Sequence, residues 1–466
     1  MPTTALDKRS SGAPADSQAA GKGVGRYKWW ALFLLILTYA SNFMDRIVVA
    51  TVGQAMKLDL DLSDLQLGLL GGMAFAFFYA VLGIPLARLS ERFNRVKIIA
   101  ACTLLWSAMT TLCGFAQHYT HLLLFRIGVG VGEAGSTPAA HSLLADYFPS
   151  GRRGTAFALY SLGVPIGAII GAFGGGWIVQ NIGWREAFIY MGAPGIVLAA
   201  LVLFTVREPE RGSTDSLVGA AAVPPFRAVL RLLARKSTFL HLAFGCALIG
   251  FANFGINMFI PIFYSRVFHM SYAQAGLAFG VITGVGSLIG TMLGGYLADW
   301  AGKRDARWYL WVVAIGVGVA APLYMLAFIQ SSWLVSVVMM LVFGSFMYMW
   351  YGPTFAIAYT LVGARMRASC SAIILLITTL LGQGLGPVFN GWLSDRFTRE
   401  AFTHGSYLTV CGKGASEAGS EIATACSQAS ASGIRSAMMV CALMFMWGAF
   451  HYYWASRSLI KDKEPI

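Results

Sequence analysis

ERFNR at residues 91–95 is a short charged turn between two long apolar stretches, and DWAGK at residues 299–303 holds the same place 208 residues later. A Gly-Trp pair at 176–177 recurs at 391–392, at nearly the same spacing. Matched landmarks at one spacing indicate that a unit of about six apolar stretches is duplicated. Parallel repeats of this kind meet at a shared interface near the middle of a membrane.

The composition predicts an all-α, polytopic membrane protein. Of 466 residues, 57% are hydrophobic and 12% are charged, and the mean hydropathy is +0.65, far above that of soluble proteins. A helix needs about 20 apolar residues to cross a hydrocarbon core of about 30 Å. Twelve stretches are long enough, at residues 29–56, 63–90, 97–117, 121–147, 152–180, 184–206, 238–268, 272–300, 307–329, 332–362, 367–394 and 434–456.

The net charge of +13 could indicate a nucleic-acid partner, but the distribution of the charge argues against one. Most Lys and Arg residues fall on segments that are cytoplasmic if the N-terminus is inside, which is the positive-inside pattern of membrane proteins. An even number of spans returns the chain to the same side. We therefore expect a multi-pass protein of the plasma (inner) membrane with both termini in the cytoplasm.

The spans divide the chain into two six-helix bundles and their connections. The predicted units are a disordered cytoplasmic arm at 1–28, an N-terminal bundle at 29–206, a cytoplasmic linker at 207–237, a C-terminal bundle at 238–456 and a cytoplasmic tail at 457–466. In the linker, Phe226, Val229, Leu230 and Leu233 recur at helical spacing. This pattern predicts an amphipathic helix on the inner membrane face.

The connection at 395–433 is predicted to be a long external loop that contains Cys411 and Cys426. These two cysteines lie outside both the membrane and the reducing cytoplasm. They could form a disulfide if the outer compartment is oxidising, or they could remain free thiols.

Four ionisable residues inside the predicted spans, Asp45, Arg46, Arg126 and Glu133, are the main candidates for a functional site. Each charge at mid-membrane costs roughly 2.5 to 3.5 kcal/mol, so these groups must pair or line a water-filled cavity. Arg126 and Glu133 are two turns apart on one helix face, about 10 Å along the axis. Asp45 and Arg46 point in different directions, and the sequence does not decide which one faces the cavity.

We hypothesise that Asp45 and Glu133 exchange protons with alternating exposure, while Arg126, with Arg46, binds an anionic substrate group. The alternative is that the four charges only join spans one and four, since buried ion pairs often fix geometry without chemistry.

The C-terminal bundle is predicted to carry no charge inside the membrane, so its polar residues are amides, hydroxyls and phenols. They would suit the apolar and neutral parts of an amphiphile. Alternatively, the amides bond across helices. With two N-terminal residues, the candidate cavity lining is Tyr39, Asn42, Asn253, Asn257, Tyr359, Thr379 and Gln383.

Several motifs resemble those of the major facilitator superfamily over essentially the whole chain. They are the turn at 91–95, its repeat GYLAD at 295–299 and GWR at 183–185. ERFNR is also similar to the turn of the spinster subfamily, and NFMDR at 42–46 and RIGVGVGEAG at 126–135 resemble its signatures. The resemblance implies two six-helix bundles in a monomeric transporter, and an amphiphilic substrate of the lysophospholipid or sphingosine phosphate type.

The resemblance also gives the cytoplasmic turns a mechanical role. They would form ion-pair latches that hold helix ends together when the cytoplasmic side is closed. Alternatively, these charges only anchor loops. The latch residues are Glu91, Arg92, Arg95, Arg152 and Arg153 in the first half, and Asp299 and Lys303 in the second.

Three classes of function compete: a proton-coupled lipid transporter, a transporter of a drug or small organic anion, and a membrane-embedded enzyme or receptor. The duplicated twelve-span pattern argues against the third. His, Cys and carboxylates do not occur at metal-ligand spacing, and no nucleophile arrangement is recognisable, so we expect no metal, cofactor or catalytic residue.

Overall fold

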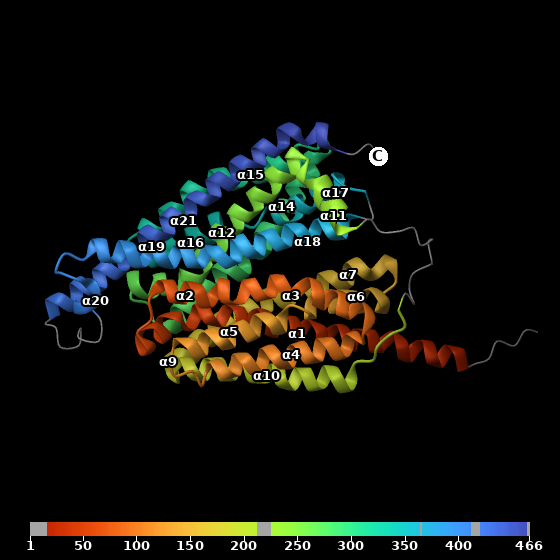
Figure 1. Cartoon of the computed structure of the whole chain (residues 1–466), viewed down its shortest axis with the longest axis horizontal. Coiled ribbons are helices and arrows are strands. Elements are labelled where there is room, and N and C mark those ends of the chain that lie inside the picture. The colour runs from red at the N-terminus through yellow and green to blue at the C-terminus, as the bar shows by residue number, and fades with distance from the viewer. Residues whose placement is uncertain (1–15, 212–224, 364–365, 412–419, 464–466) are drawn as a thin grey trace, which may run out of the picture.

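The computed structural model describes residues 16–211, 225–363, 366–411 and 420–463. In these ranges every regular element is a helix, which confirms the predicted all-α class. Eleven of the described helical segments are long and apolar enough to cross a membrane. The remaining predicted span, 121–147, consists of α5 (Tyr119–Glu133) and α6 (Ser136–Tyr147), with a two-residue break between them. The chain therefore has the predicted twelve-span architecture (Figure 1).

Six spans form the N-terminal half, here called the N-half, and some contain more than one helical piece. In chain order they are α1 (Asp16–Leu60); α2 (Asp64–Gly71) with α3 (Met73–Arg92); α4 (Arg95–Cys113); α5 with α6; α7 (Ser150–Ser161) with α8 (Gly163–Ile169) and α9 (Gly175–Asn181); and α10 (Trp184–Thr205). A π-helical turn, Ile170–Gly174, joins α8 to α9.

The C-terminal half, the C-half, repeats this plan. Its spans are α12 (Ser237–Val267); α13 (Tyr272–Gly280) with α14 (Gly286–Gly302); α15 (Trp308–Leu326); α16 (Trp333–Phe346) with α17 (Tyr351–Thr360); α18 (Arg367–Ile377) with α19 (Leu385–Ala401); and α21 (Ser420–Asp462). A short helix, α20 (Tyr407–Val410), lies between α19 and α21.

Several helices extend beyond the apolar stretches that predict them. The arm predicted at 1–28 is helical from Asp16 onward, and residues 1–15 lie outside the described ranges. The loop predicted at 395–433 is shortened from both sides, because α19 continues to Ala401 and α21 begins at Ser420. Hydropathy marks where lipid begins, whereas a helix satisfies its own backbone and can continue into water.

The start of the linker is attached to the N-half, and its helix is attached to the C-half. At its start, the Tyr27 hydroxyl donates to Thr205 O at 2.6 Å and accepts from Arg207 N at 2.5 Å, which holds this segment on the N-half. The predicted amphipathic helix is α11 (Phe226–Ala234), with Val229 and Leu233 buried. This helix packs against α12 and α18, so it belongs to the C-half.

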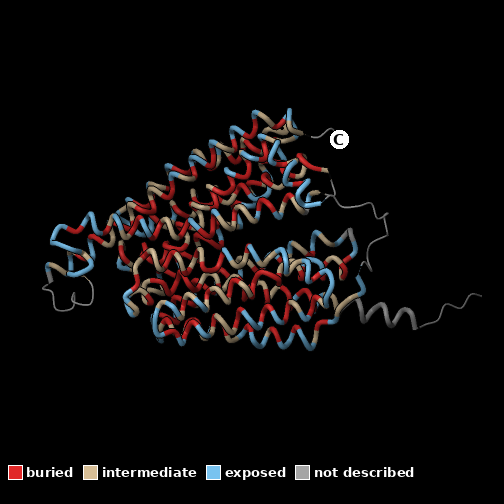
Figure 2. Tube along the Cα trace, in the orientation of Figure 1, coloured by how far each residue is buried: buried red, intermediate tan, exposed pale blue. Residues whose placement is uncertain are grey.

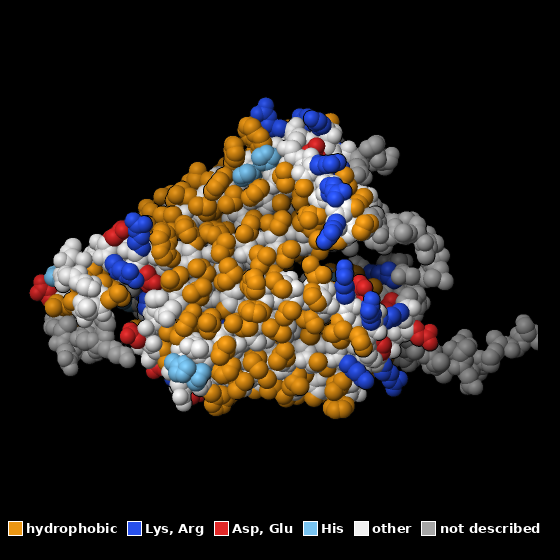
Figure 3. Space-filling model, in the orientation of Figure 1, with side chains coloured by type: hydrophobic (Ala, Val, Ile, Leu, Met, Phe, Trp, Pro, Cys, Tyr) orange, Lys and Arg blue, Asp and Glu red, His pale blue; other side chains and the backbone are white. Residues whose placement is uncertain are grey.

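The molecule has two unlike ends. We call the end that carries α11 the linker end, and the end that carries α20 the loop end (Figure 1). Figure 2 shows the two halves in contact through buried residues at the loop end and diverging at the linker end. The space-filling view shows a hollow between the halves that opens at the linker end (Figure 3).

Two glycines allow the halves to meet backbone to backbone at the loop end. A Cβ on Gly68 of α2 would lie 2.2 Å from Pro387 O of α19, and a Cβ on Gly391 of α19 would lie 2.2 Å from Asp64 O of α2. Small residues of this kind are the usual basis of tight helix packing in membranes. Any larger side chain at either position would separate α2 from α19.

Candidate functional site

Arg46 of α1 and Glu133 of α5 form the central ion pair, with Arg46 Nε 2.6 Å from Glu133 Oε2. The Glu133 side chain is fully buried, whereas the Arg46 side chain is 18% exposed. Rings of Phe43, Phe75 and Tyr79 surround the guanidinium, with centroids 4.8 to 5.3 Å from its carbon. A charge-assisted hydrogen bond and three aromatic faces thus hold a partly accessible cation between the halves.

Asp45, adjacent to Arg46, is fully buried. Neither of its carboxyl oxygens has a hydrogen-bond partner among the described residues. The sequence left open which of the two residues faces the cavity; in this conformation Arg46 is partly exposed and Asp45 is not. Asp45 lies instead toward α4 and α5.

Arg126 of α5 is also buried, but it contacts backbone rather than a carboxylate. Its Nε donates to Leu70 O at 3.3 Å and its Nη1 to Asp45 O at 3.4 Å. Glu133 is therefore paired with Arg46 and not with Arg126, the residue that shares its helix face. Seven residues place the two about 10 Å apart along one helix, so contact with Glu133 needs a partner from another helix.

The candidate lining residues of the C-half are mostly half-buried and bonded to one another. Asn257 Nδ2 donates to Asn253 Oδ1 at 2.7 Å and to the Tyr348 hydroxyl at 2.9 Å. The Tyr359 hydroxyl pairs with Ser371 at 2.7 Å. These amides bond within and across helices, the alternative that the sequence left open.

Four more predicted lining residues occupy varied surroundings. Tyr39 stacks on Tyr160 with ring centroids 4.4 Å apart. Asn42 is buried, and its Oδ1 has no hydrogen-bond partner in the described ranges. In the π-helical turn Thr378–Gly384, Gln383 is buried and Thr379 is half-buried.

A second charged cluster closes the loop end and joins the halves. Asp64 of α2 is 1% exposed and accepts two bonds from Arg266 of α12, both at 2.7 Å. It also accepts from Lys57 at 2.6 Å and from Ser394 of α19 at 2.6 Å. We call this set, with Asp395, the loop-end network.

Asp395 of α19 completes the network by capping a helix in the other half. Its carboxylate accepts from the backbone N–H groups of Asp64 at 3.0 Å and Leu65 at 2.8 Å, which are free donors at the start of α2.

Sequence reasoning missed the loop-end network, and the expectation of no charge inside the C-half is wrong, because Arg266 is buried within the predicted span 238–268. The four charges lie near span ends, where hydropathy assigns charge to loops. A usable signal was Arg266 itself, an arginine inside a predicted span with no assigned partner.

The sequence-family model of the major facilitator superfamily matches residues 34–387 of the chain. The chain belongs to this superfamily. An MFS-type efflux pump of Mycolicibacterium smegmatis is 36% identical over 387 residues, which cover 83% of this chain and 89% of that protein. Protein spinster homolog 1 of Homo sapiens is 27% identical over 394 residues, 79% of this chain and 74% of that protein.

Among solved structures, a bacterial homologue of the human lysosomal transporter Spinster superposes with a TM-score of 0.86 at 34% identity, covering 94% of this chain and 99% of that chain. That structure is described as inward-facing and unoccupied. This major facilitator therefore resembles spinster proteins, as the motifs predicted. It is a multi-pass membrane transporter, not an enzyme.

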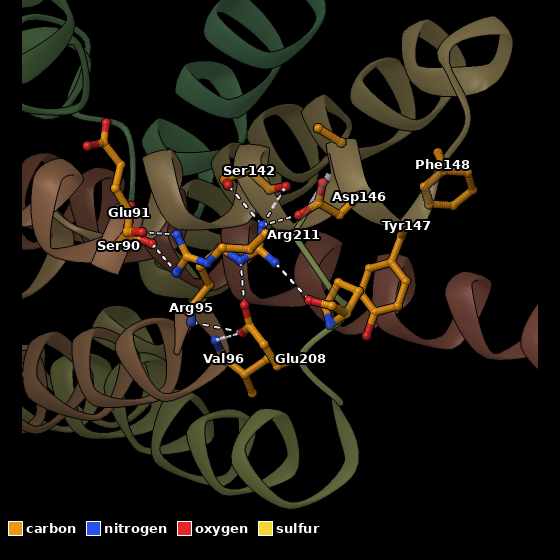
Figure 4. A network of polar contacts seen from close by, with 12 residues as sticks. Ser90, Glu91, Arg95, Val96, Ser142, Asp146, Tyr147, Phe148, Glu208 and Arg211 are labelled. Atoms are coloured by element: carbon orange, nitrogen blue, oxygen red, sulfur yellow. Dashed lines mark hydrogen bonds and ion pairs between the residues drawn. The ribbon is translucent and has the colours of Figure 1, made fainter. Parts of the chain in front are cut away.

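In this major facilitator the ERFNR turn centres on Arg95, which is 1% exposed (Figure 4). Arg95 forms ion pairs with Asp146 of α6 and with Glu208, the latter at 2.6 Å. Its Nη1 also donates to the Ser142 hydroxyl at 3.0 Å. We call these four residues the linker-end network; all of them belong to the N-half.

The predicted latch belongs to a closed cytoplasmic side, whereas the halves diverge at the linker end in this conformation (Figure 2). Arg92 and Arg152 are exposed, and Glu91 contributes its backbone O to Arg211. Arg153 Nε donates to Ala145 O at 3.0 Å. The sequence could not foresee the pairing of Arg95, because Asp146 comes from another span and Glu208 from the linker.

In the C-half of this major facilitator, Asp299 accepts from the Tyr309 hydroxyl at 2.7 Å, while Lys303 is exposed. At the loop end, Cys411 and Cys426 are joined in a disulfide, one of the two alternatives considered for this pair. The bond links α20 to the start of α21.

Proposed function

We propose that this transporter works by alternating access, is coupled to protons, and moves an amphiphilic substrate of the lysophospholipid or sphingosine phosphate type. The observation that carries the proposal is the unequal lining of the central cleft. Arg46 presents a partly exposed guanidinium on the N-half. The C-half offers neutral groups, including Asn253 and Asn257. A charged wall opposite a neutral one suits a molecule with an anionic head and an apolar tail.

Glu133 gives this site a way to couple substrate to protons. As a carboxylate it occupies Arg46 and competes with any anionic headgroup for the guanidinium. When Glu133 takes up a proton, the O–H bond forms on its carboxyl group and the ion pair is lost. Arg46 can then hold a phosphate through paired hydrogen bonds.

Asp45 is the second proton carrier in this proposal. Among the described residues, no hydrogen bond of standard geometry reaches its carboxyl oxygens, so little offsets the loss of hydration that a buried negative charge suffers. We infer that Asp45 holds a proton here and releases it when the helices rearrange. Arg126, already bonded to the Asp45 backbone O, is the cation available to the released carboxylate.

Proteoliposomes that carry the purified protein test these roles. We expect a pH gradient to drive lysophospholipid uptake, Asp45→Asn to abolish that gradient dependence, and Arg46→Gln to weaken binding of the anionic lipid. Arg185→Gln is a matched control, because Arg185 forms an exposed pair with Asp59 away from the cleft. Gradient-driven uptake by Asp45→Asn at the wild-type rate would contradict the coupling.

A drug or small organic anion is the second candidate substrate, and the 36% identity to an MFS-type efflux pump favours it. Both candidates use the same fold and the same cation. The same vesicles, offered lysophospholipid, sphingosine phosphate, common drugs and a small organic anion in turn, separate them. Competition by a small, wholly polar anion without competition by lysophospholipid would favour the second candidate.

We further propose that the linker end faces the cytoplasm of a plasma (inner) membrane protein that works as a monomer. Lys and Arg side chains gather at this end in the space-filling view, as the positive-inside pattern requires (Figure 3). Single cysteines at Arg231 and at His404, labelled from one side of intact cells, test the orientation. Labelling of the cysteine at position 231 from outside the cell would mean that the linker end faces outward, opposite to the proposed orientation.

A further inference from the structure

Unpartnered polar atoms gather in one part of the N-half interior, behind the central ion pair. Eight of the twelve buried side-chain N and O atoms that lack a hydrogen-bond partner in the described residues belong to α1, α4 and α5. They include both carboxyl oxygens of Asp45 and the hydroxyls of Ser41, Ser107 and Thr110. Native proteins rarely leave such atoms without a partner unless a water, an ion or a chemical role explains them.

The hydroxyls of Ser41, Ser107 and Thr110 differ from the threonine hydroxyls elsewhere on α1 and α4. Thr38 and Thr51 of α1, and Thr103 and Thr111 of α4, each donate to the carbonyl four residues earlier. That bond is the usual way in which a membrane helix satisfies a hydroxyl. Ser41, Ser107 and Thr110 do not make it, although all three are at most 4% exposed.

The geometry places these hydroxyls beside Asp45. Thr110 lies close enough to interact with the Asp45 carboxyl group, although the two groups do not form a hydrogen bond of standard geometry in this conformation. A Cβ on Gly195 of α10 would lie 2.0 Å from Ser107 Oγ and 3.1 Å from Ser41 Oγ, so both oxygens face one point on α10. The two oxygens therefore lie at most about 5 Å apart, a separation that a single water can bridge.

Asp45, Ser41, Thr110 and Ser107 form two pairs, here called rungs, each with one residue on α1 and one on α4. Asp45 and Ser41 are one turn apart on α1, and Thr110 and Ser107 are one turn apart on α4. Both helices start at the linker end, so the Ser41 and Ser107 rung lies nearer that end than the Asp45 and Thr110 rung. The cleft opens at the same end (Figure 3).

We propose that Thr110, Ser107 and Ser41 form a buried hydroxyl relay that carries the Asp45 proton toward the linker end, separate from the cleft that Arg46 faces. The relay rests on the proposed function, since it needs Asp45 to exchange protons. Asp45 loses its O–H proton to the relay, each hydroxyl or bridging water accepts one proton as it passes another on, and the carboxylate remains.

Two features favour a relay over a bound metal cation. Ser and Thr hydroxyls both donate and accept, as proton passage requires. The charged and titratable groups around Asp45 are Arg126 and Glu133 from α5 and Cys113 from α4. The Arg126 guanidinium bonds to the Asp45 backbone, and a fixed positive charge there opposes a second cation.

The relay is tested by removing its hydroxyls in the full-length protein. In vesicles with a pH-sensitive dye inside, Ser107→Ala and Thr110→Val should slow proton movement and gradient-driven lysophospholipid uptake by at least about tenfold. Substrate binding and substrate-for-substrate exchange, which move no net proton, should remain at wild-type levels. Thr110→Ser keeps the hydroxyl and should restore the rate. In D2O the wild-type rate should fall.

Thr103→Val is the matched control. It removes a buried hydroxyl from the same helix, but one that bonds to its own backbone, so proton movement should not change. Wild-type rates in Ser107→Ala and Thr110→Val, or an equal loss in Thr103→Val, would overturn the relay while leaving Asp45→Asn as the separate test of coupling. Transport driven by a sodium gradient instead of a pH gradient would overturn both proposals.

Discussion

The loop-end network and the linker-end network both bury arginines and carboxylates, but they connect different things. At the loop end, Asp64 of the N-half is bonded to Arg266 and Ser394 of the C-half. At the linker end, Arg95 bonds to Asp146 and Glu208 within the N-half. Contacts between halves must break when a transporter changes its open side, whereas contacts inside one half move with it. We therefore expect the first network to bias the conformational equilibrium and the second to stabilise the N-half.

The largest effect is expected from Asp64→Asn. This change keeps the shape of the side chain but leaves the buried Arg266 and the half-buried Lys57 without their shared carboxylate. Breaking a buried pair in this way costs about 3 to 5 kcal/mol, and here it destabilises the conformation that is closed at the loop end. Spin labels on the two halves at the loop end should report wider separation. An unchanged distance distribution would show that the network does not hold the halves together.

Arg95→Met tests the linker-end network, which lies within the N-half. Asp146 and Glu208 would each lose an ion pair with Arg95, so the N-half should be less stable by about 2 kcal/mol, the scale of hydrogen bonds to charged groups. The measurement is thermal unfolding of the purified protein in detergent. Loop-end label distances should match wild type, and a shift there as large as that of Asp64→Asn would erase the distinction between the networks.

Gly391→Val adds bulk to the loop-end interface without touching a charge. Its Cβ would meet Asp64 O at 2.2 Å, and overpacking of this kind typically costs 1 to 3 kcal/mol, about 2 kcal/mol here. Loop-end label distances should increase. Gly295→Ala is the control, because a Cβ there meets nothing within 4 Å. Equal behaviour of the two variants would rule out close packing as a contribution to closure.

The smallest effect is expected from Asp59→Asn. Asp59 pairs with Arg185 at the same end of the molecule, at 2.7 Å, but the pair is exposed and lies within the N-half. Exposed ion pairs contribute at most about 1 kcal/mol. Both unfolding temperature and loop-end distances should remain close to wild type. A large increase in the loop-end distances would mean that any charge at the loop end, and not only those that join the two halves, controls whether this end is closed.

The spans were predictable from the sequence because each must supply about 20 apolar residues, and hydropathy reports that directly. The outer limits of α1, α19 and α21 were not, because a helix that continues into water needs no apolar residues. Arg46 and Glu133 were recognised as candidates, but their pairing depends on how α1 and α5 are rotated. Asp64 and Arg266 were missed because each lies near the end of its span.

The cap that Asp395 places on α2 links opening of the loop end to exposure of two peptide groups. If α19 withdraws, the N–H groups of Asp64 and Leu65 lose the carboxylate that accepts from them, and water must take its place. The positive end of a helix dipole is uncovered at the same moment. These two amides should therefore exchange with deuterium at a rate that measures how often the unlabelled, unmutated transporter opens at its loop end.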